Sequence, residues 1–179
     1  MDFSSVPEIF DNIDRTRARL LAAVEGLSEG QQTYSPAPDR WSVAQLVEHL
    51  SIVEGNVTTL LDRMLSKAEE AEAGAETSDT FDPVSIEEFV ERSRGVKLEA
   101  PERIRPTGAL SVADSLARLN DSRAALQALR PRVERADGRA LRFPHPAWGP
   151  LDLYQWLLFL GAHEDRHLSQ IEALKQAMK

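Results

Sequence analysis

Residues Leu151–Met178 read LDLYQWLLFLGAHEDRHLSQIEALKQAM, and their apolar side chains recur every three or four positions. This spacing predicts one amphipathic helix. The expected buried stripe comprises Leu153, Trp156, Leu157, Leu160, His163, His167, Ile171 and Leu174. Two histidines thus take positions that are otherwise apolar. An unpaired imidazole in a helix interface is costly, so the pair indicates a polar or metal site inside a helical bundle.

Three earlier segments show the same periodicity. They predict helices from about Pro7 to Leu27, from Ser42 to near Glu72, and from Ser111 to Pro131. Ser42 with Gln45, and Ser111 with Asp114, have the spacing of a helix N-terminal cap. Gly30 is expected to follow the first helix. Pro131 is expected to end or bend the third, since proline disfavours the α conformation in the residue before it.

The connection Ala73–Leu110 is long for a compact domain. Ser85 and Glu88 predict a short helix within it that ends before Gly95. No run of β-branched or aromatic residues alternates with polar ones, so no strands are expected. We therefore interpret the chain as all-α: a four-helix bundle with a long crossover between helices two and three, forming a single domain over residues 1–179.

Composition restricts the classes of function. The chain has 179 residues, a formal net charge of −8 and no cysteine, so disulfides and thiolate ligands are excluded. The acidic balance and the absence of a basic stripe argue against nucleic-acid binding. The N-terminus has no signal-peptide pattern and the longest apolar run is far too short to span a membrane. A cytoplasmic protein without membrane contact is expected.

The histidines predict a metal site. His163 and His167 are four residues apart and so lie on one helical face, and His49 lies beside the apolar stripe of the second helix. Three protein ligands that leave a coordination position open are typical of a catalytic zinc-like site. Neutral imidazole suits zinc, nickel, iron or copper. The alternative is that these are core histidines whose nitrogens are satisfied by hydrogen bonds.

The string His163–His167 also matches the H-E-x-x-H signature of zinc proteases, in which Glu164 would be the general base. The extended signature fails, because Gln170 and Ala173 occupy its glycine and third-histidine positions. The protease is therefore a remote alternative, and Glu164 is expected to be solvated or to lie behind the ligands.

Other polar residues are weaker candidates. Asn56, two turns beyond His49, and Gln170, one turn beyond His167, are predicted to contact a substrate or to orient a ligand. Asn56 could instead be an interior amide. His145 is expected in an exposed loop, and Trp41 is interpreted as a core anchor.

Two segments carry a family resemblance. HPAWGPLDLYQWLLFLGAHEDRHLSQI, His145–Ile171, and RWSVAQLVEHL, Arg40–Leu50, resemble the DinB-like superfamily in the same order along the chain. The resemblance implies a four-helix bundle that holds a divalent metal with three histidines, which correspond to His49, His163 and His167. Relatives include S-transferases that depend on bacillithiol or mycothiol, a mycothiol-dependent maleylpyruvate isomerase, and proposed metal-dependent hydrolases.

Two functions from different classes follow. The first is a metal-dependent enzyme, with zinc or nickel as the expected metal, that activates a small thiol cosubstrate or water for transfer or hydrolysis of a small-molecule substrate. Because the chain lacks cysteine, the thiol would come from a low-molecular-weight cosubstrate. The second is a non-catalytic bundle, in a stress response, that binds a metal or small molecule and can act as a homodimer. No residue is assigned a catalytic role.

Overall fold

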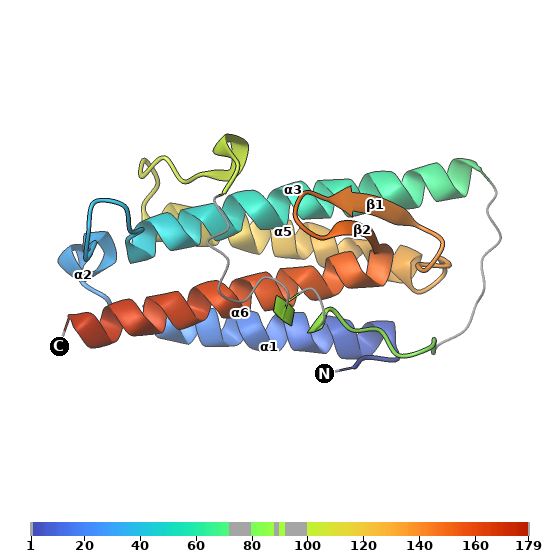
Figure 1. Ribbon diagram of the computed structural model, residues 1–179, viewed down its shortest axis with the longest axis horizontal. Coiled ribbons are helices and arrows are strands. Elements are labelled where there is room, and N and C mark those ends of the chain that lie inside the picture. The colour runs from blue at the N-terminus through green and yellow to red at the C-terminus, as the bar shows by residue number, and fades with distance from the viewer. Residues whose placement is uncertain (1, 72–79, 88–89, 92–99, 179) are drawn as a thin grey trace.

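The computed structural model describes residues 2–71, 80–87, 90–91 and 100–178 (Figure 1). Four long helices dominate these ranges: α1 (Val6–Val24), α3 (Val43–Glu70), α5 (Val112–Val133) and α6 (Leu153–Ala177). They confirm the predicted four-helix bundle, with bounds within a few residues of those expected. None of the helices in these ranges is both long and apolar enough to cross a bilayer.

The helix starts form as their sequences predict. The Ser42 side chain accepts a hydrogen bond from the Gln45 main-chain N–H (3.3 Å), and the Gln45 side chain accepts one from the Ser42 N–H (3.0 Å). The Ser111 side chain accepts the Asp114 N–H (3.0 Å). Each cap satisfies main-chain donors that a helix leaves unpaired in its first turn.

The four helices form two parallel pairs, α1 with α6 and α3 with α5 (Figure 1). Contacts near both ends of each pair fix the direction. Early in α1 and α6, Asn12 lies against Gly161, and late in both helices Lys175 donates to the Ala23 oxygen (2.6 Å). A parallel pair requires the chain to return along the length of the bundle. The predicted crossover between the second and third long helices makes this return.

The chain near two predicted helix ends differs in detail from the expectation. Gly30 lies inside a short helix, α2 (Glu29–Thr33), which Ser28 and Gln31 cap reciprocally. Pro131 lies inside α5, which continues to Val133. Pro131 lacks only one helical hydrogen bond, and the next turn still forms because the Glu134 N–H donates to the Arg130 oxygen (2.9 Å).

The expectation of no strands is wrong. β1 (Arg142–His145) and β2 (Gly149–Asp152) form an antiparallel hairpin that immediately precedes α6 in the chain. Its turn closes at Gly149, whose positive φ of 77° suits glycine. The Trp156 indole donates to the Phe143 oxygen (3.1 Å) and so fixes the hairpin to α6. The strands were not predicted because they are short and contain two prolines, which usually argue against a strand.

The crossover is described only in part. The predicted short helix between Ser85 and Gly95 falls mostly outside the described residues, which omit Glu88 and Gly95 themselves. Where the chain is described, the Val90 N–H donates to the Ile86 oxygen (3.0 Å). The Phe3 and Val84 main chains bond each other, and a short 3-10 helix, η1 (Glu102–Ile104), lies against α3.

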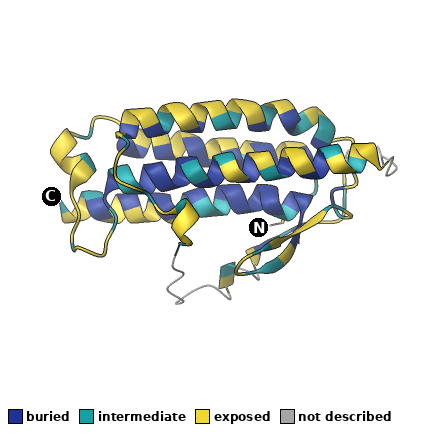
Figure 2. Cartoon of the chain, turned by 90° about the horizontal axis from the view of Figure 1, so that it is seen from above, coloured by how far each residue is buried: buried dark blue, intermediate teal, exposed yellow. Residues whose placement is uncertain are grey.

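The buried faces of the helices point inward (Figure 2) and form two apolar clusters. One lies at the hairpin end and includes Phe10, Ile13, Leu61, Leu126 and Leu157. The other lies at the opposite end and includes Leu20, Val47, Leu50, Leu119 and Ile171. Between them lies a polar level, to which each long helix contributes one buried or largely buried charged side chain: Arg17, Glu54, Arg123 and Glu164. This polar level holds the candidate site.

Candidate metal centre

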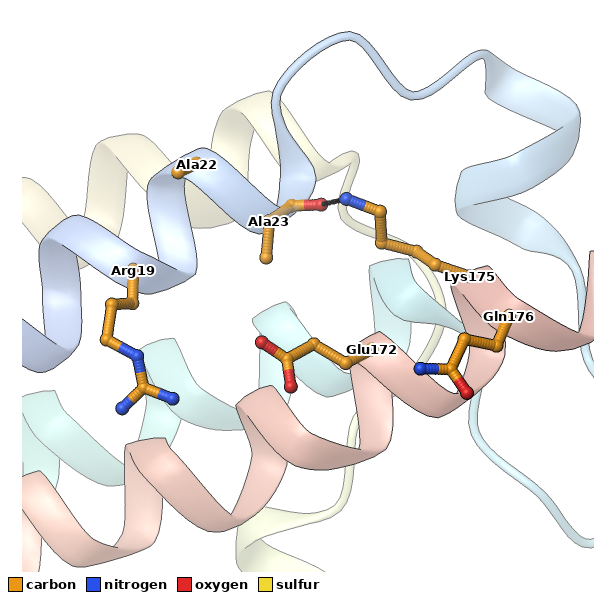
Figure 3. Close-up of a pocket in the computed structure, with 6 residues that line it drawn as sticks. All are labelled: Arg19, Ala22, Ala23, Glu172, Lys175 and Gln176. Carbon is orange, nitrogen blue, oxygen red and sulfur yellow. Dashed lines mark hydrogen bonds between the residues drawn. The ribbon is translucent and has the colours of Figure 1, made fainter.

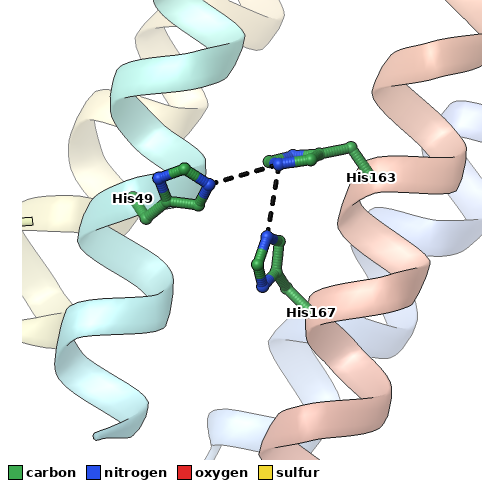
Figure 4. Close-up of side chains that lie close together, drawn as sticks. All are labelled: His49, His163 and His167. Carbon is green, nitrogen blue, oxygen red and sulfur yellow. Dashed lines mark hydrogen bonds between the residues drawn. The ribbon is translucent and has the colours of Figure 1, made fainter. Parts of the chain in front are cut away.

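Three histidines converge between α3 and α6 (Figure 4). The Nε2 atom of His163 lies 3.2 Å from Nε2 of His49 and 3.2 Å from Nε2 of His167. His163 and His167 are one turn apart on α6, and His49 reaches them from α3. In the part of the chain that the structure describes, no fourth histidine or carboxylate side chain joins the group. The structure thus brings together the three residues that the sequence singled out.

The other ring nitrogens determine which tautomers are present. His49 Nδ1 donates to the main-chain oxygen of Ile104 (2.7 Å), and His167 Nδ1 donates to the side-chain oxygen of Gln170 (2.7 Å). Because both partners accept, the proton of each neutral ring lies on Nδ1. The Nε2 atoms of His49 and His167 then carry lone pairs that point at His163.

The three rings do not carry enough protons to make both Nε2–Nε2 contacts hydrogen bonds. His163 Nε2 faces two unprotonated nitrogens and can offer at most one proton, so at least one 3.2 Å contact joins two lone pairs. A cation removes that repulsion. An ion about 2.0–2.1 Å from two nitrogens at a tetrahedral angle would separate them by roughly 3.3 Å. The geometry therefore suits one divalent metal.

Burial keeps the three rings neutral. Desolvation lowers the pKa of His49, and it lowers the pKa of His167 to about 3. Desolvation and the neighbouring rings together lower the pKa of His163 well below its usual range. Neutral imidazole is the form that binds metal. Protons therefore compete weakly for these nitrogens near neutral pH.

Two aromatic rings wall the histidines. Trp41, just before the α3 cap, lies against His49 with ring centroids 4.8 Å apart and faces His167 at 6.3 Å. Phe159 lies 5.1 Å from His163 on the other side. Trp41 was interpreted only as a core anchor. Its place one residue before the cap of the histidine-bearing helix is the signal that could have identified it.

The two weaker candidates lie in different surroundings. Gln170 touches His167 and holds its Nδ1 proton, as one prediction for it allowed. Asn56 is exposed on α3, two turns beyond His49, so it is not an interior amide. Its predicted contact with a substrate remains a prediction.

His145 is not in an exposed loop, as was expected. It lies in β1, partly buried, and its ring packs on Trp148 (4.7 Å), Trp156 (5.3 Å) and Phe159 (5.0 Å). Burial lowers its pKa to about 4. Phe159 separates its ring from His163, so the fourth histidine borders the cluster without joining it.

Glu164 is buried, and a second polar cluster explains why. The arginine–glutamate cluster comprises Arg17, Glu54, Arg123 and Glu164, one from each long helix. Arg17 donates to both Glu164 oxygens (2.7 and 3.2 Å) and to Glu54 (2.5 Å). Burial raises the pKa of Glu164, and the two arginines act against that shift. The solvated position allowed for Glu164 is thus wrong. The sequence gives no sign of this cluster, because each charge resembles an ordinary surface residue.

A surface hollow lined by described residues lies elsewhere. It has a volume of about 410 Å³, lies between the later turns of α1 and α6, and is lined by Arg19, Glu172 and Lys175 among others (Figure 3). None of the histidines lines it. The convergent nitrogens, and not this surface hollow, mark the chemistry of the chain.

Comparisons with known proteins place the chain in a family and support its fold. A family model described as the DinB superfamily matches residues 12–171. The uncharacterized protein YuaE of Bacillus subtilis is 26% identical over 157 residues, which are 87% of this chain and 90% of that protein.

Two solved structures share the fold. TT2238, described as a four-helix bundle protein, has a TM-score of 0.63 at 22% identity, over 94% of this chain and 99% of its own. YfiT from Bacillus subtilis, described as a probable metal-dependent hydrolase with an unusual four-helix bundle topology, has a TM-score of 0.65 at 20% identity, over 97% and 87%. Both confirm the bundle. The chain belongs to the DinB superfamily.

Proposed function

We propose that this protein is a metal-dependent enzyme in which His49, His163 and His167 hold one divalent ion through Nε2. The observation that carries the proposal is that His163 Nε2 lies 3.2 Å from both His49 Nε2 and His167 Nε2, while Nδ1 of His49 and Nδ1 of His167 already donate to acceptors. Zinc or nickel is the metal we expect, because both suit a site built from neutral imidazoles.

The reaction we propose is activation of a small nucleophile for hydrolysis or group transfer. A divalent metal with three histidine ligands acts as a Lewis acid and lowers the pKa of a bound water or thiol toward neutral. The chain supplies three nitrogens, which leaves positions for the nucleophile or substrate. Trp41 and Phe159 exclude water from two sides of the rings. The Ile104 oxygen and Gln170 hold the Nδ1 protons.

The nucleophile is water or a low-molecular-weight thiol. The chain contains no cysteine, so any thiol comes from a cosubstrate such as bacillithiol, mycothiol or glutathione. The resemblance to thiol-dependent S-transferases supports the thiol. The description of YfiT as a probable metal-dependent hydrolase supports water. A peptidase has less support, because the Glu164 carboxylate already binds Arg17 and Arg123 and so is poorly placed as a general base.

Metal analysis of matched variants tests the binding step. We expect about one ion per chain in the wild type and a sharp loss in His49→Ala, His163→Ala and His167→Ala. His145→Gln is the control: it changes the fourth histidine, which lies outside the cluster, and should keep its metal. Full metal in His163→Ala and His167→Ala would show that the assignment is wrong.

An activity screen of the metal-loaded protein tests catalysis. It pairs a panel of electrophiles with each thiol, and a panel of esters and amides with water alone. Turnover that disappears in His163→Ala supports the enzyme. A full metal site with no turnover in either panel would favour the alternative of a binding protein.

A further inference from the structure

The crossover segment between η1 and α5 is attached to α3 beside the metal centre. Glu48, 2% exposed, accepts the Thr107 N–H (3.0 Å), the Thr107 hydroxyl (2.7 Å) and the Gly108 N–H (2.8 Å). A buried carboxylate needs such donors, because desolvation without them is costly. These contacts make Glu48 the anchor of this segment.

The same segment supplies an acceptor to a metal-centre histidine. The Ile104 oxygen takes the Nδ1 proton of His49 at 2.7 Å. Only Arg105 and Pro106 separate Ile104 from Thr107, and proline fixes one of the backbone angles between them. The 3-10 turn is also closed, because the Arg105 N–H donates to the Glu102 oxygen (3.1 Å). The position of the Ile104 oxygen therefore depends on where Thr107 is held.

We propose that Glu48 is a positioning residue for the metal centre: by holding Thr107 and Gly108 it keeps the Ile104 oxygen on His49 Nδ1. Adjacent residues on α3 thus serve one purpose, since Glu48 attaches the crossover and His49 uses its carbonyl. This inference rests on the proposed function only where it concerns metal affinity. Partners that orient a metal-binding histidine typically change metal affinity about 10–100-fold when removed.

Glu48→Gln is the primary test. The variant keeps the shape of the side chain but replaces one acceptor oxygen with an amide that cannot accept the Gly108 N–H. We expect zinc affinity, measured by competition with a chromophoric chelator, to fall about 10–100-fold. Nitrogen–proton correlation spectra of the histidine rings in the metal-free protein report the tautomer of His49. In the wild type the proton should lie on Nδ1. In the variant the neutral ring should be a mixture of the Nδ1–H and Nε2–H tautomers.

Substitutions at Thr107 show whether Glu48 acts by positioning the crossover segment or through its charge. They also provide a second test if Glu48→Gln does not fold. Thr107→Val removes one hydrogen bond to Glu48 and leaves the Glu48 charge in place, so we expect the same two changes with a smaller size. Thr107→Ser keeps the hydroxyl and should behave as the wild type. Loss of affinity in Glu48→Gln with both readouts unchanged in Thr107→Val would mean that Glu48 acts through its charge, which overturns the proposal.

The ring spectra keep this inference separate from the proposed function. If the wild type binds no metal but Glu48→Gln still moves the His49 proton, the proposed function fails and the positioning role stands. If the wild type binds zinc and Glu48→Gln changes neither zinc affinity nor the His49 proton, the positioning role fails and the proposed function stands. A lower melting temperature alone, with both readouts unchanged, also overturns the positioning role.

Discussion

Successive residues of α6 enter two different polar clusters. His163 faces α3 and meets His49, whereas Glu164 faces α1 and meets Arg17. Both clusters are buried at the level between the two apolar clusters. In the arginine–glutamate cluster, donors and acceptors are matched within the chain: two guanidinium groups face two carboxylates. In the histidine cluster, at least one contact joins two acceptor nitrogens with no proton between them.

The difference shows that the role of a buried polar cluster depends on whether its hydrogen-bond donors and acceptors are matched within the chain. A charge network that is complete within the chain joins the helices and has no unmet chemistry for a ligand. Three neutral rings whose lone pairs converge are incomplete without a cation. The arginine–glutamate cluster should therefore determine stability, and the histidine cluster should determine ligand binding. Each experiment below separates these two effects.

The largest expected effect is on stability, from Arg17→Met. This change leaves the Glu54 and Glu164 carboxylates without their shortest contacts, and removal of one partner from a buried ion pair typically costs about 3–5 kcal/mol. Denaturant unfolding of the metal-free protein measures the loss. Metal content of the folded variant should be unchanged.

Arg19→Met is the matched control on the same helix. Arg19 pairs with Asp165 at 2.6 Å, but both side chains are at least half exposed, at 57% and 50%. Exposed pairs contribute about 0–1 kcal/mol. Equal losses for the two variants would show that burial of the arginine–glutamate cluster does not matter, and the comparison would fail.

An intermediate effect is expected from metal itself. Free metal at 100 times its dissociation constant should stabilise the wild type by about 2.7 kcal/mol, because only the folded chain holds the site together. Glu164→Gln should start from lower stability yet gain the same increment, whereas His163→Ala should gain none. Thermal melts with and without zinc give both numbers. An increment that disappears in Glu164→Gln would mean that the two clusters are not independent.

The smallest expected effect, counted for one histidine over one pH unit, is the pH dependence of the stability of the metal-free protein. Burial depresses the pKa of His49, His163 and His167 in the folded state, with His167 at about 3. The unfolded chain therefore binds more protons between about pH 6.5 and 3, so stability is complete above about pH 6.5 and is lost as the pH falls. The slope approaches about 1.4 kcal/mol per pH unit for each histidine that stays neutral.

Unfolding free energies measured from pH 7.5 to 5.5 test this, in a range that lies above the usual pKa of exposed carboxylates. Metal-loaded protein should keep its ion across this range and lose it at lower pH, because burial makes protons weak competitors for the nitrogens. A metal-free protein whose stability does not change between these pH values would contradict neutral, buried histidines.

The sequence predicted the features that depend on local pattern. Apolar periodicity located the four long helices, the Ser42 and Ser111 caps marked two helix starts, and helical spacing placed His163 and His167 on one face. His49 could be added because it lies beside an apolar stripe. Each of these properties is set by residues within a few positions of one another, so one sequence suffices to find them.

The features that were missed depend on distant partners. Arg17 reads as a surface residue, and only the approach of Glu54 and Glu164 from other helices allows its burial. The Ile104 oxygen is a main-chain atom and has no sequence signal. The hairpin carries Pro144 and Pro150, which pair with each other, so the residues that usually argue against strands lie inside it.

The parallel pairing of the helices also has a kinetic consequence. Helical bundles fold fast when their contacts are local. Here Arg17 and Glu164 are 147 residues apart, and His49 and His163 are 114 apart. Loop closure over such lengths costs entropy before any contact compensates for it. Both polar clusters should therefore assemble late, when α6 docks, and the apolar face of α1 that packs against α6 must remain uncovered until that step.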